Sequence, residues 1–87
     1  MAPTISRFYG IRVYINFREH NPPHFHAAYG DFEASFDMTG ELMAGSLPHN
    51  ASRLVSQWAA LHSAELMENW NRAQSGQTLF NIIPLDA

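Results

Sequence analysis

Alternating apolar and polar residues predict three to four β-strands in the first half of the chain. From Ile5 to Phe17 the pattern is typical of one strand with a kink at Gly10, because the apolar residues after this glycine fall on one face. Two further alternating runs cover His24–Tyr29 and Phe32–Met38. The short segment Glu41–Gly45 fits a fourth strand.

A tight hairpin is predicted where Gly30-Asp31 separates two alternating runs, because a two-residue turn led by glycine joins antiparallel strands. This turn places Phe25 opposite Phe36 on the apolar side and His24 opposite Asp37 on the polar side. Directly opposed residues have Cβ atoms about 4.5–5.5 Å apart. We therefore expect a hydrogen bond between the imidazole of His24 and the carboxylate of Asp37.

The second half of the chain has the apolar spacing of helices. Residues 49–75 fit either one bent helix or two helices separated near His62-Ser63, where Ser63 would cap the second. Ser46–Pro48 is typical of a helix entry, and Gly76 of the position after a helix end. Leu79–Leu85 is a short apolar run that predicts an edge strand.

These elements predict an α+β fold in a single domain of residues 1–87. An antiparallel meander of three to four strands would be followed by a helical hairpin and a short C-terminal edge strand. One face of the sheet would pack on the helices, and the other would stay in water. The expected apolar contacts join Ile11, Val13, Ile15, Phe17, Phe25 and Phe36 to Trp58, Leu61, Leu66 and Trp70. The water-facing side chains would be Arg12, Tyr14, Asn16, Arg18, His24, His26, Glu33, Ser35 and Asp37.

The amino-acid composition argues against several classes of function. The chain has no cysteine, which excludes disulfides, zinc–thiolate sites and thiol nucleophiles. Its first residues lack the features of a secretory signal and no run is long enough to span a membrane, so we expect a cytoplasmic protein without membrane contact. The net charge of −3 argues against a general nucleic-acid binder. The basic side chains Arg7, Arg12 and Arg18 nevertheless give the first 18 residues a local positive charge.

The strongest candidate site is the segment Arg18–His26, which brings three histidines close to two prolines. Proline fixes φ near −65° and keeps the preceding residue out of the helical region, so this segment should form a rigid corner. Histidine titrates near neutral pH and serves in proton transfer, metal ligation and phosphate contact.

A metal site is one interpretation of this cluster. His24 and His26 lie two apart on a strand and therefore point to the same face. His20, Glu19 or Asp37 would complete the ligand set, which suits a divalent metal such as zinc.

A metal-independent ribonuclease is the second interpretation. His24, aligned by Asp37, would act as the base, and His26 or His20 as the acid. The residues expected to bind the RNA substrate, as phosphate contacts and a base-stacking surface, are Arg12, Arg18 and Tyr14.

Two non-catalytic interpretations remain open. The histidines are also compatible with ordinary polar residues on a solvated sheet face. The same face or an edge strand would alternatively dock a protein partner. The pattern leaves a homo-oligomer open as well.

Several short motifs, taken together, carry a resemblance along nearly the whole chain. They are Pro3-Thr4-Ile5, Phe8-Tyr9-Gly10, Arg18-Glu19-His20-Asn21-Pro22-Pro23-His24-Phe25-His26, Tyr29-Gly30, Leu54-Val55 with Trp58-Ala59, Glu65-Leu66 with Asn69-Trp70, and Ile82 with Pro84-Leu85. In these motifs the chain resembles the small bacterial family known as domain of unknown function 4160. The resemblance implies a toxin-like member of a bacterial toxin–antitoxin pair, whose partner is a small antitoxin-like protein. It supplies no catalytic residues.

Overall fold

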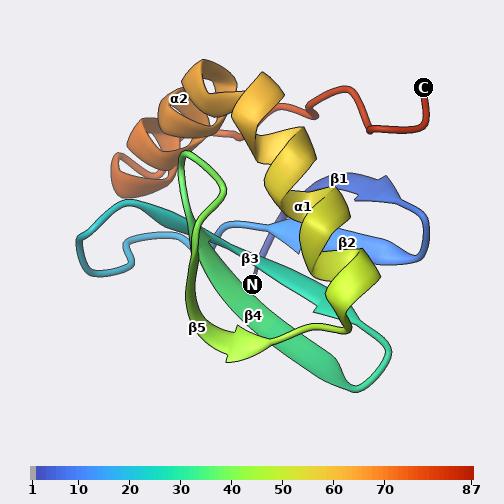
Figure 1. Ribbon diagram of the computed structural model, residues 1–87. Coiled ribbons are helices and arrows are strands. Elements are labelled where there is room, and N and C mark those ends of the chain that lie inside the picture. Colours follow the sequence, from blue (N-terminus) through green and yellow to red (C-terminus); the bar gives the residue numbers. More distant parts are fainter. Residues whose placement is uncertain (1) are drawn as a thin grey trace.

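The computed structural model describes residues 2–87 and has an α+β architecture, with a five-stranded antiparallel sheet followed by two helices (Figure 1). The strands lie side by side in chain order, β1 to β5. Helix α1 crosses one face of the sheet, and α2 follows it (Figure 1). The elements are β1 (Thr4–Phe8), β2 (Ile11–Tyr14), β3 (His24–Tyr29), β4 (Phe32–Asp37), β5 (Leu42–Ser46), α1 (His49–Leu61) and α2 (Ser63–Gln74).

The first strand of the prediction is two strands. Tyr9 and Gly10 form a two-residue turn in which both residues have positive φ, 49° and 78°, and Phe8 pairs with Ile11 across it. Positive φ at both central positions is the geometry of the hairpin turn whose twist suits antiparallel strands. The single kinked strand from residue 5 to 17 was therefore wrong, and the sheet has five strands rather than three or four.

The central hairpin confirms the predicted register. β3 and β4 pair with Phe25 opposite Phe36 and His24 opposite Asp37. Gly30 leads the turn with a φ of 57°. The two phenylalanine rings stack with centroids 5.5 Å apart, so a slip by one residue would move this pair out of the core.

Strand β5 forms the outer edge of the sheet beside β4. A bulge interrupts their pairing, and Gly45 sits so close to β4 that an added Cβ would clash with the carbonyl oxygen of Glu33. All five residues of β5 are exposed. Ser46 belongs to this strand, and Pro48 is the residue before α1.

The core lies between the sheet and the two helices, and Ile82 of the C-terminal segment belongs to it. The indole of Trp58 contacts the rings of Phe25 and Phe8 at centroid distances of 6.0 and 5.3 Å. Two of the expected core residues do not belong to it, because Phe17 follows the end of β2 and Leu61 is the last residue of α1. Their exposed fractions are 37% and 68%.

The helical region consists of two helices. His62 leaves helical geometry with φ −124° and ψ 26°, and it, rather than Ser63, is the residue that precedes α2. Gly76 has a φ of 72° and directly follows Ser75, the C-cap residue of α2. The amide of Gln77 donates to the carbonyl of Arg72 at 2.8 Å, which completes a glycine-terminated helix end as predicted.

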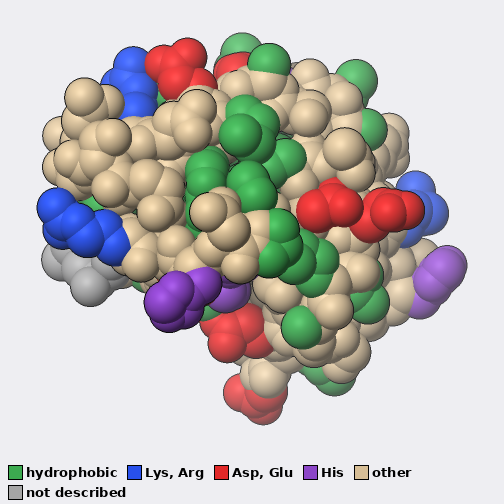
Figure 2. Space-filling model, turned by 90° about the vertical axis from the view of Figure 1, so that its left-hand side faces the viewer, with side chains coloured by type: hydrophobic (Ala, Val, Ile, Leu, Met, Phe, Trp, Pro, Cys, Tyr) green, Lys and Arg blue, Asp and Glu red, His purple; other side chains and the backbone are tan. Residues whose placement is uncertain are grey.

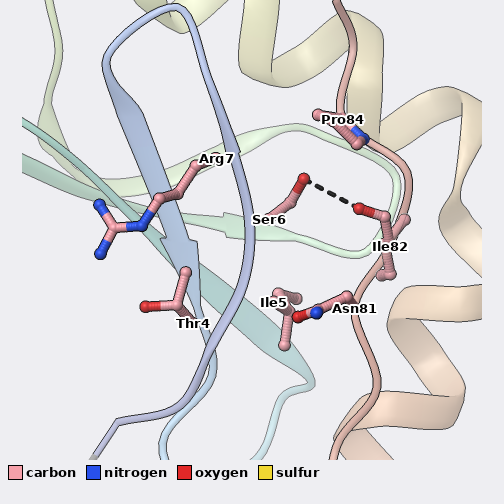
Figure 3. Close-up of a pocket in the computed structure, with 7 residues that line it drawn as sticks. All are labelled: Thr4, Ile5, Ser6, Arg7, Asn81, Ile82 and Pro84. Carbon is pink, nitrogen blue, oxygen red and sulfur yellow. Dashed lines mark hydrogen bonds between the residues drawn. The ribbon is translucent and has the colours of Figure 1, made fainter. Parts of the chain in front are cut away.

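The C-terminal segment is extended but is not a strand of the sheet. Only one backbone hydrogen bond joins it to β1 in the described part of the chain, from the amide of Ile82 to the carbonyl of Ile5 at 2.8 Å. Two side chains also bind this segment. The hydroxyl of Ser6 donates to the carbonyl of Ile82, and the indole N–H of Trp58 donates to the carbonyl of Ile83. Figure 3 shows the Ser6 contact in a pocket between β1 and this segment. The volume of this pocket is about 380 Å³.

Within residues 2–87, neither helix has the length and apolar character needed to cross a membrane.

Candidate metal centre

The loop between β2 and β3, residues 15–23, carries the first side chain of the site. It is attached to the last turn of α2 by two hydrogen bonds. The amide of Arg18 donates to the carbonyl of Ala73 at 3.3 Å, and the side chain of Gln74 donates to the carbonyl of Glu19 at 3.0 Å. Arg18 itself adopts a φ of 55°, which turns the chain toward the sheet. These contacts fix the backbone at Glu19.

Strand β3 supplies the two histidines of the site. Because side chains alternate along a strand, His24 and His26 point away from the core while Phe25 points into it. His26 pairs with Tyr14 of β2, and the imidazole stacks on the phenol with ring centroids 5.0 Å apart. His24 lies against Trp70 of α2 at 5.3 Å. An aromatic ring therefore supports each imidazole.

Glu19 joins the two histidines. Its Oε2 lies 3.1 Å from Nε2 of His24, and its Oε1 lies 2.6 Å from Nε2 of His26. One ligand atom from each of the three residues lies within 4.8 Å of the others, and all three residues are half-buried. Figure 2, which faces the side of the molecule with this loop and α2, shows histidine side chains at the surface next to acidic ones.

A backbone carbonyl orients the ring of His24. Nδ1 of His24 lies 2.8 Å from the carbonyl oxygen of Pro22, an acceptor, so Nδ1 carries the proton of this hydrogen bond. A histidine whose Nδ1–H donates to a carbonyl presents Nε2 as a metal ligand, and this arrangement is common in metal sites. The corner built by the prolines thus aims one nitrogen of His24 at Glu19.

The side chain of Asn16 also binds the carboxylate of Glu19. Its Nδ2 donates to Oε1 of Glu19 at 3.0 Å and lies 3.5 Å from Nε2 of His26. Burial raises the pKa of Glu19, but the hydrogen bonds and positive charge of His26 and His24 outweigh burial. The net pKa of Glu19 is lowered, which keeps its carboxylate charged in the metal-free protein.

Asp37 is not the partner of His24, although their backbones pair as predicted. The Oδ1 of Asp37 accepts the hydroxyl of Thr39 at 2.7 Å and the amides of Thr39 and Glu41 at 2.9 and 3.0 Å. These nearby donors draw the carboxylate into the β4–β5 turn, as is usual for aspartate at a turn. The predicted imidazole–carboxylate contact with Asp37 was wrong, and Glu19 takes its place.

The remaining predicted site residues lie outside the group formed by Glu19, His24 and His26. His20 is exposed and is not among the converging ligands of residues 2–87. The guanidinium of Arg18 lies against Gly76, at the end of α2. Arg12 donates to Thr4 and to the carbonyl of Ala2 at 2.7 and 2.6 Å.

Tyr14 is buried, with its ring between the guanidinium of Arg12 and the imidazole of His26. The Cζ of Arg12 lies 4.3 Å from the centroid of this ring. Tyr14 therefore supports His26 and does not offer a free stacking surface for a nucleobase.

Sequence reasoning underestimated Glu19 and did not assign Asn16 a role. Glu19 stands next to the histidine–proline corner, which was the available signal, but only the loop conformation brings it between the imidazoles. In the sequence Asn16 alternates with Tyr14 on the polar side of the predicted first strand, which gave a weak signal.

Comparisons with known proteins agree with the resemblance in the sequence. Neither a curated protein nor a solved structure matches the chain. The family model described as a domain of unknown function, DUF4160, matches residues 10–71, which include β2 to β5, the Glu19 loop, α1 and most of α2. Because this match covers more than half of the chain, the protein belongs to the DUF4160 family.

Proposed function

We propose that the protein binds a divalent metal ion through Glu19, His24 and His26. The observation that supports this proposal best is the convergence of two Nε2 atoms and a carboxylate within 4.8 Å. Two imidazoles and one carboxylate suit zinc and also iron(II), for which this set is a frequent site. The carbonyl of Pro22 and the amide of Asn16 would act as the outer partners that orient such ligands.

A metal held by three protein ligands keeps at least one position open. Zinc held in this way would supply Lewis-acid activation of water, and metal-assisted hydrolysis is the reaction class that this would support. The three protein ligands would hold the ion, and Trp70 and Tyr14 would restrict the movement of the imidazoles.

The geometry supports a metal site better than metal-independent RNA cleavage. Acid–base cleavage needs two groups on opposite sides of the reacting phosphate. Here both imidazoles direct Nε2 toward the same carboxylate, from ring centroids 5.1 Å apart. The guanidinium of Arg12 is committed to Thr4 and Ala2, and Arg18 lies beside α2.

The test is metal analysis of protein purified without a histidine tag, followed by calorimetric titration with zinc, iron(II) and manganese(II). We expect close to one ion per chain, and we expect His24→Ala and His26→Ala to lose it. His49→Ala is the matched control, because His49 is exposed at the start of α1 and far along the chain from the loop. A wild-type protein that shows no saturable binding of any of these metals would overturn the proposal.

A toxin-like role in a two-protein bacterial module is the second proposal. What supports it is the half-buried group of Glu19, His24 and His26, a surface that a small antitoxin-like partner would cover. RNA would be the substrate of such a toxin. Growth and RNA integrity would be measured on expression with and without the protein encoded beside it. Toxicity that persists unchanged in both His24→Ala and His26→Ala would exclude a role for these histidines.

A further inference from the structure

We propose that a trough beside His26 binds a primary alkylammonium group and forms the substrate subsite of the metal centre. Binding of the ammonium group stands on the trough alone, whereas its role as a substrate subsite rests on the metal binding proposed above.

The trough runs across the water-facing side of the sheet. Pairing places His26 of β3 opposite Ser35 of β4, and Ser35 opposite Ala44 of β5. Ser35, Ala44 and Gly45 have small side chains or none, so the surface is hollowed between His26 and the outer edge of the sheet. The volume is about 190 Å³, and the lining residues are His26, Glu33, Ala34, Ser35, Ala44 and Gly45.

The size of the trough limits what it can hold. Its volume equals that of about six water molecules in the liquid, and it lies below the roughly 300–1,000 Å³ of pockets that enclose whole drug-sized ligands. It therefore fits the end of a chain rather than a ring system. The methyl group of Ala44 can contact methylene groups, while Ser35 and Glu33 offer oxygen acceptors.

The charge of this region selects a cation. Glu33 lines the trough, is exposed, and takes part in none of the ion pairs found among residues 2–87. No lysine or arginine occurs between Arg18 and Arg53. The same stretch carries the acids Glu19, Asp31, Glu33, Asp37 and Glu41. Glu33 is the acidic residue that lines the trough, and its negative charge attracts cations.

An ammonium group can donate to all of these acceptors. It has three donors on a flexible stem, which Glu33 and Ser35 can share at the surface while the stem lies along Ala44. Because His26 belongs both to the trough and to the metal site, a ligand held here would place its neighbouring atoms next to the metal.

Nuclear magnetic resonance of the zinc-loaded full chain tests the proposal. The probes are n-butylammonium chloride and, as a matched anion, sodium butyrate. We expect n-butylammonium to shift the amide resonances of Ser35, Ala44 and Gly45 in a saturable way, and butyrate to leave them unchanged. Equal shifts with butyrate, or no saturable shift with n-butylammonium, would overturn the proposal.

Two variants sharpen the test. Glu33→Gln should weaken n-butylammonium binding about tenfold, which is the loss expected for one hydrogen bond to a charged group. Asp31→Asn removes the same charge from the adjacent turn, outside the trough, and should weaken it less than about twofold. Equal losses in these two variants would contradict specific binding by Glu33. Ala44→Phe should fill the trough and abolish binding, with circular dichroism as the check on folding.

Two further measurements assign the source of the ligand and separate the two proposals. Tighter binding of Nα-acetyl-lysine methylamide than of n-butylammonium would assign the trough to lysine side chains of peptides, and equal binding would assign it to free amines. Zinc content is measured on the same samples. Ammonium binding without zinc binding would overturn the proposed metal centre and support the proposed ammonium site. Zinc binding without ammonium binding would support the metal centre and overturn the ammonium site.

Discussion

Oε1 of Glu19 lies 2.6 Å from Nε2 of His26, and this contact joins a loop to the central strand of the sheet. The same carboxylate reaches His24 through its other oxygen, so Glu19 holds both imidazoles in one place. It is the only acidic side chain among the converging ligands of the described chain, and the site depends on its charge.

Replacing Glu19 should separate metal binding from folding. In Glu19→Gln we expect zinc affinity to fall by more than about 100-fold, because losing a ligand costs more than the 10–100-fold typical of an outer partner. Calorimetric titration measures this change. The control is Glu65→Gln, since Glu65 makes a similar 2.6 Å contact with His62 at the start of α2. An unchanged zinc affinity in Glu19→Gln would remove Glu19 from the ligand set.

Asn16 should act as a positioning residue for the carboxylate. Asn16→Ala removes the 3.0 Å hydrogen bond to Glu19, and we expect zinc affinity to fall about 10–100-fold with the stoichiometry unchanged. The visible spectrum of the cobalt(II)-substituted protein should also change, because the carboxylate is free to rotate. A variant with wild-type affinity and spectrum would show that Asn16 does not orient the ligand.

Asp37 should matter for stability and not for metal binding. In Asp37→Ala the β4–β5 turn loses the acceptor for Thr39 and Glu41, and we expect the free energy of unfolding to fall by about 1–2 kcal/mol. Urea denaturation measures the loss, and Asp31→Ala in the exposed β3–β4 turn is the control. If Asp37→Ala abolished zinc binding while the protein stayed folded, the assignment of Asp37 to the turn would be incorrect.

The pKa of Glu19 predicts how the metal-free protein responds to acid. A carboxylate with a pKa lowered by folding stabilises the protein above its ordinary pKa, and this contribution is lost as the pH falls through the lowered value. The wild-type protein should therefore lose stability below about pH 4.3, the ordinary range for glutamate. Glu19→Gln should lose less over the same range. Thermal unfolding from pH 6 to pH 3 provides the measurement, and parallel curves for the two proteins would contradict it.

Much of the fold could be predicted because local residue patterns determine it. Gly30 and the alternation around it determine the register that places Phe25 opposite Phe36. The first hairpin was missed because Tyr9 adopts positive φ, and tyrosine is not a residue from which such a turn would be inferred. In the central hairpin Gly30, Phe25 and Phe36 marked the pattern, and the predicted register was correct.

The site was predicted less well because it depends on contacts between distant segments. The histidines on β3 followed from alternation, but the position of Glu19 depends on the attachment of its loop to Ala73 and Gln74. Asp37 was assigned wrongly because its choice between His24 and the nearby donors of the turn depends on the side-chain rotamer. Register alone does not determine that choice.

The attachment of the 15–23 loop to the end of α2 has a consequence for how the protein could be controlled. Gln74 contacts the backbone of Glu19 across 55 residues of sequence. Fraying of the last helical turn would therefore let the carboxylate drift from the imidazoles and weaken its hold on a cation. A molecule that clamps or unwinds this turn could set the occupancy of the centre without touching any of its ligands.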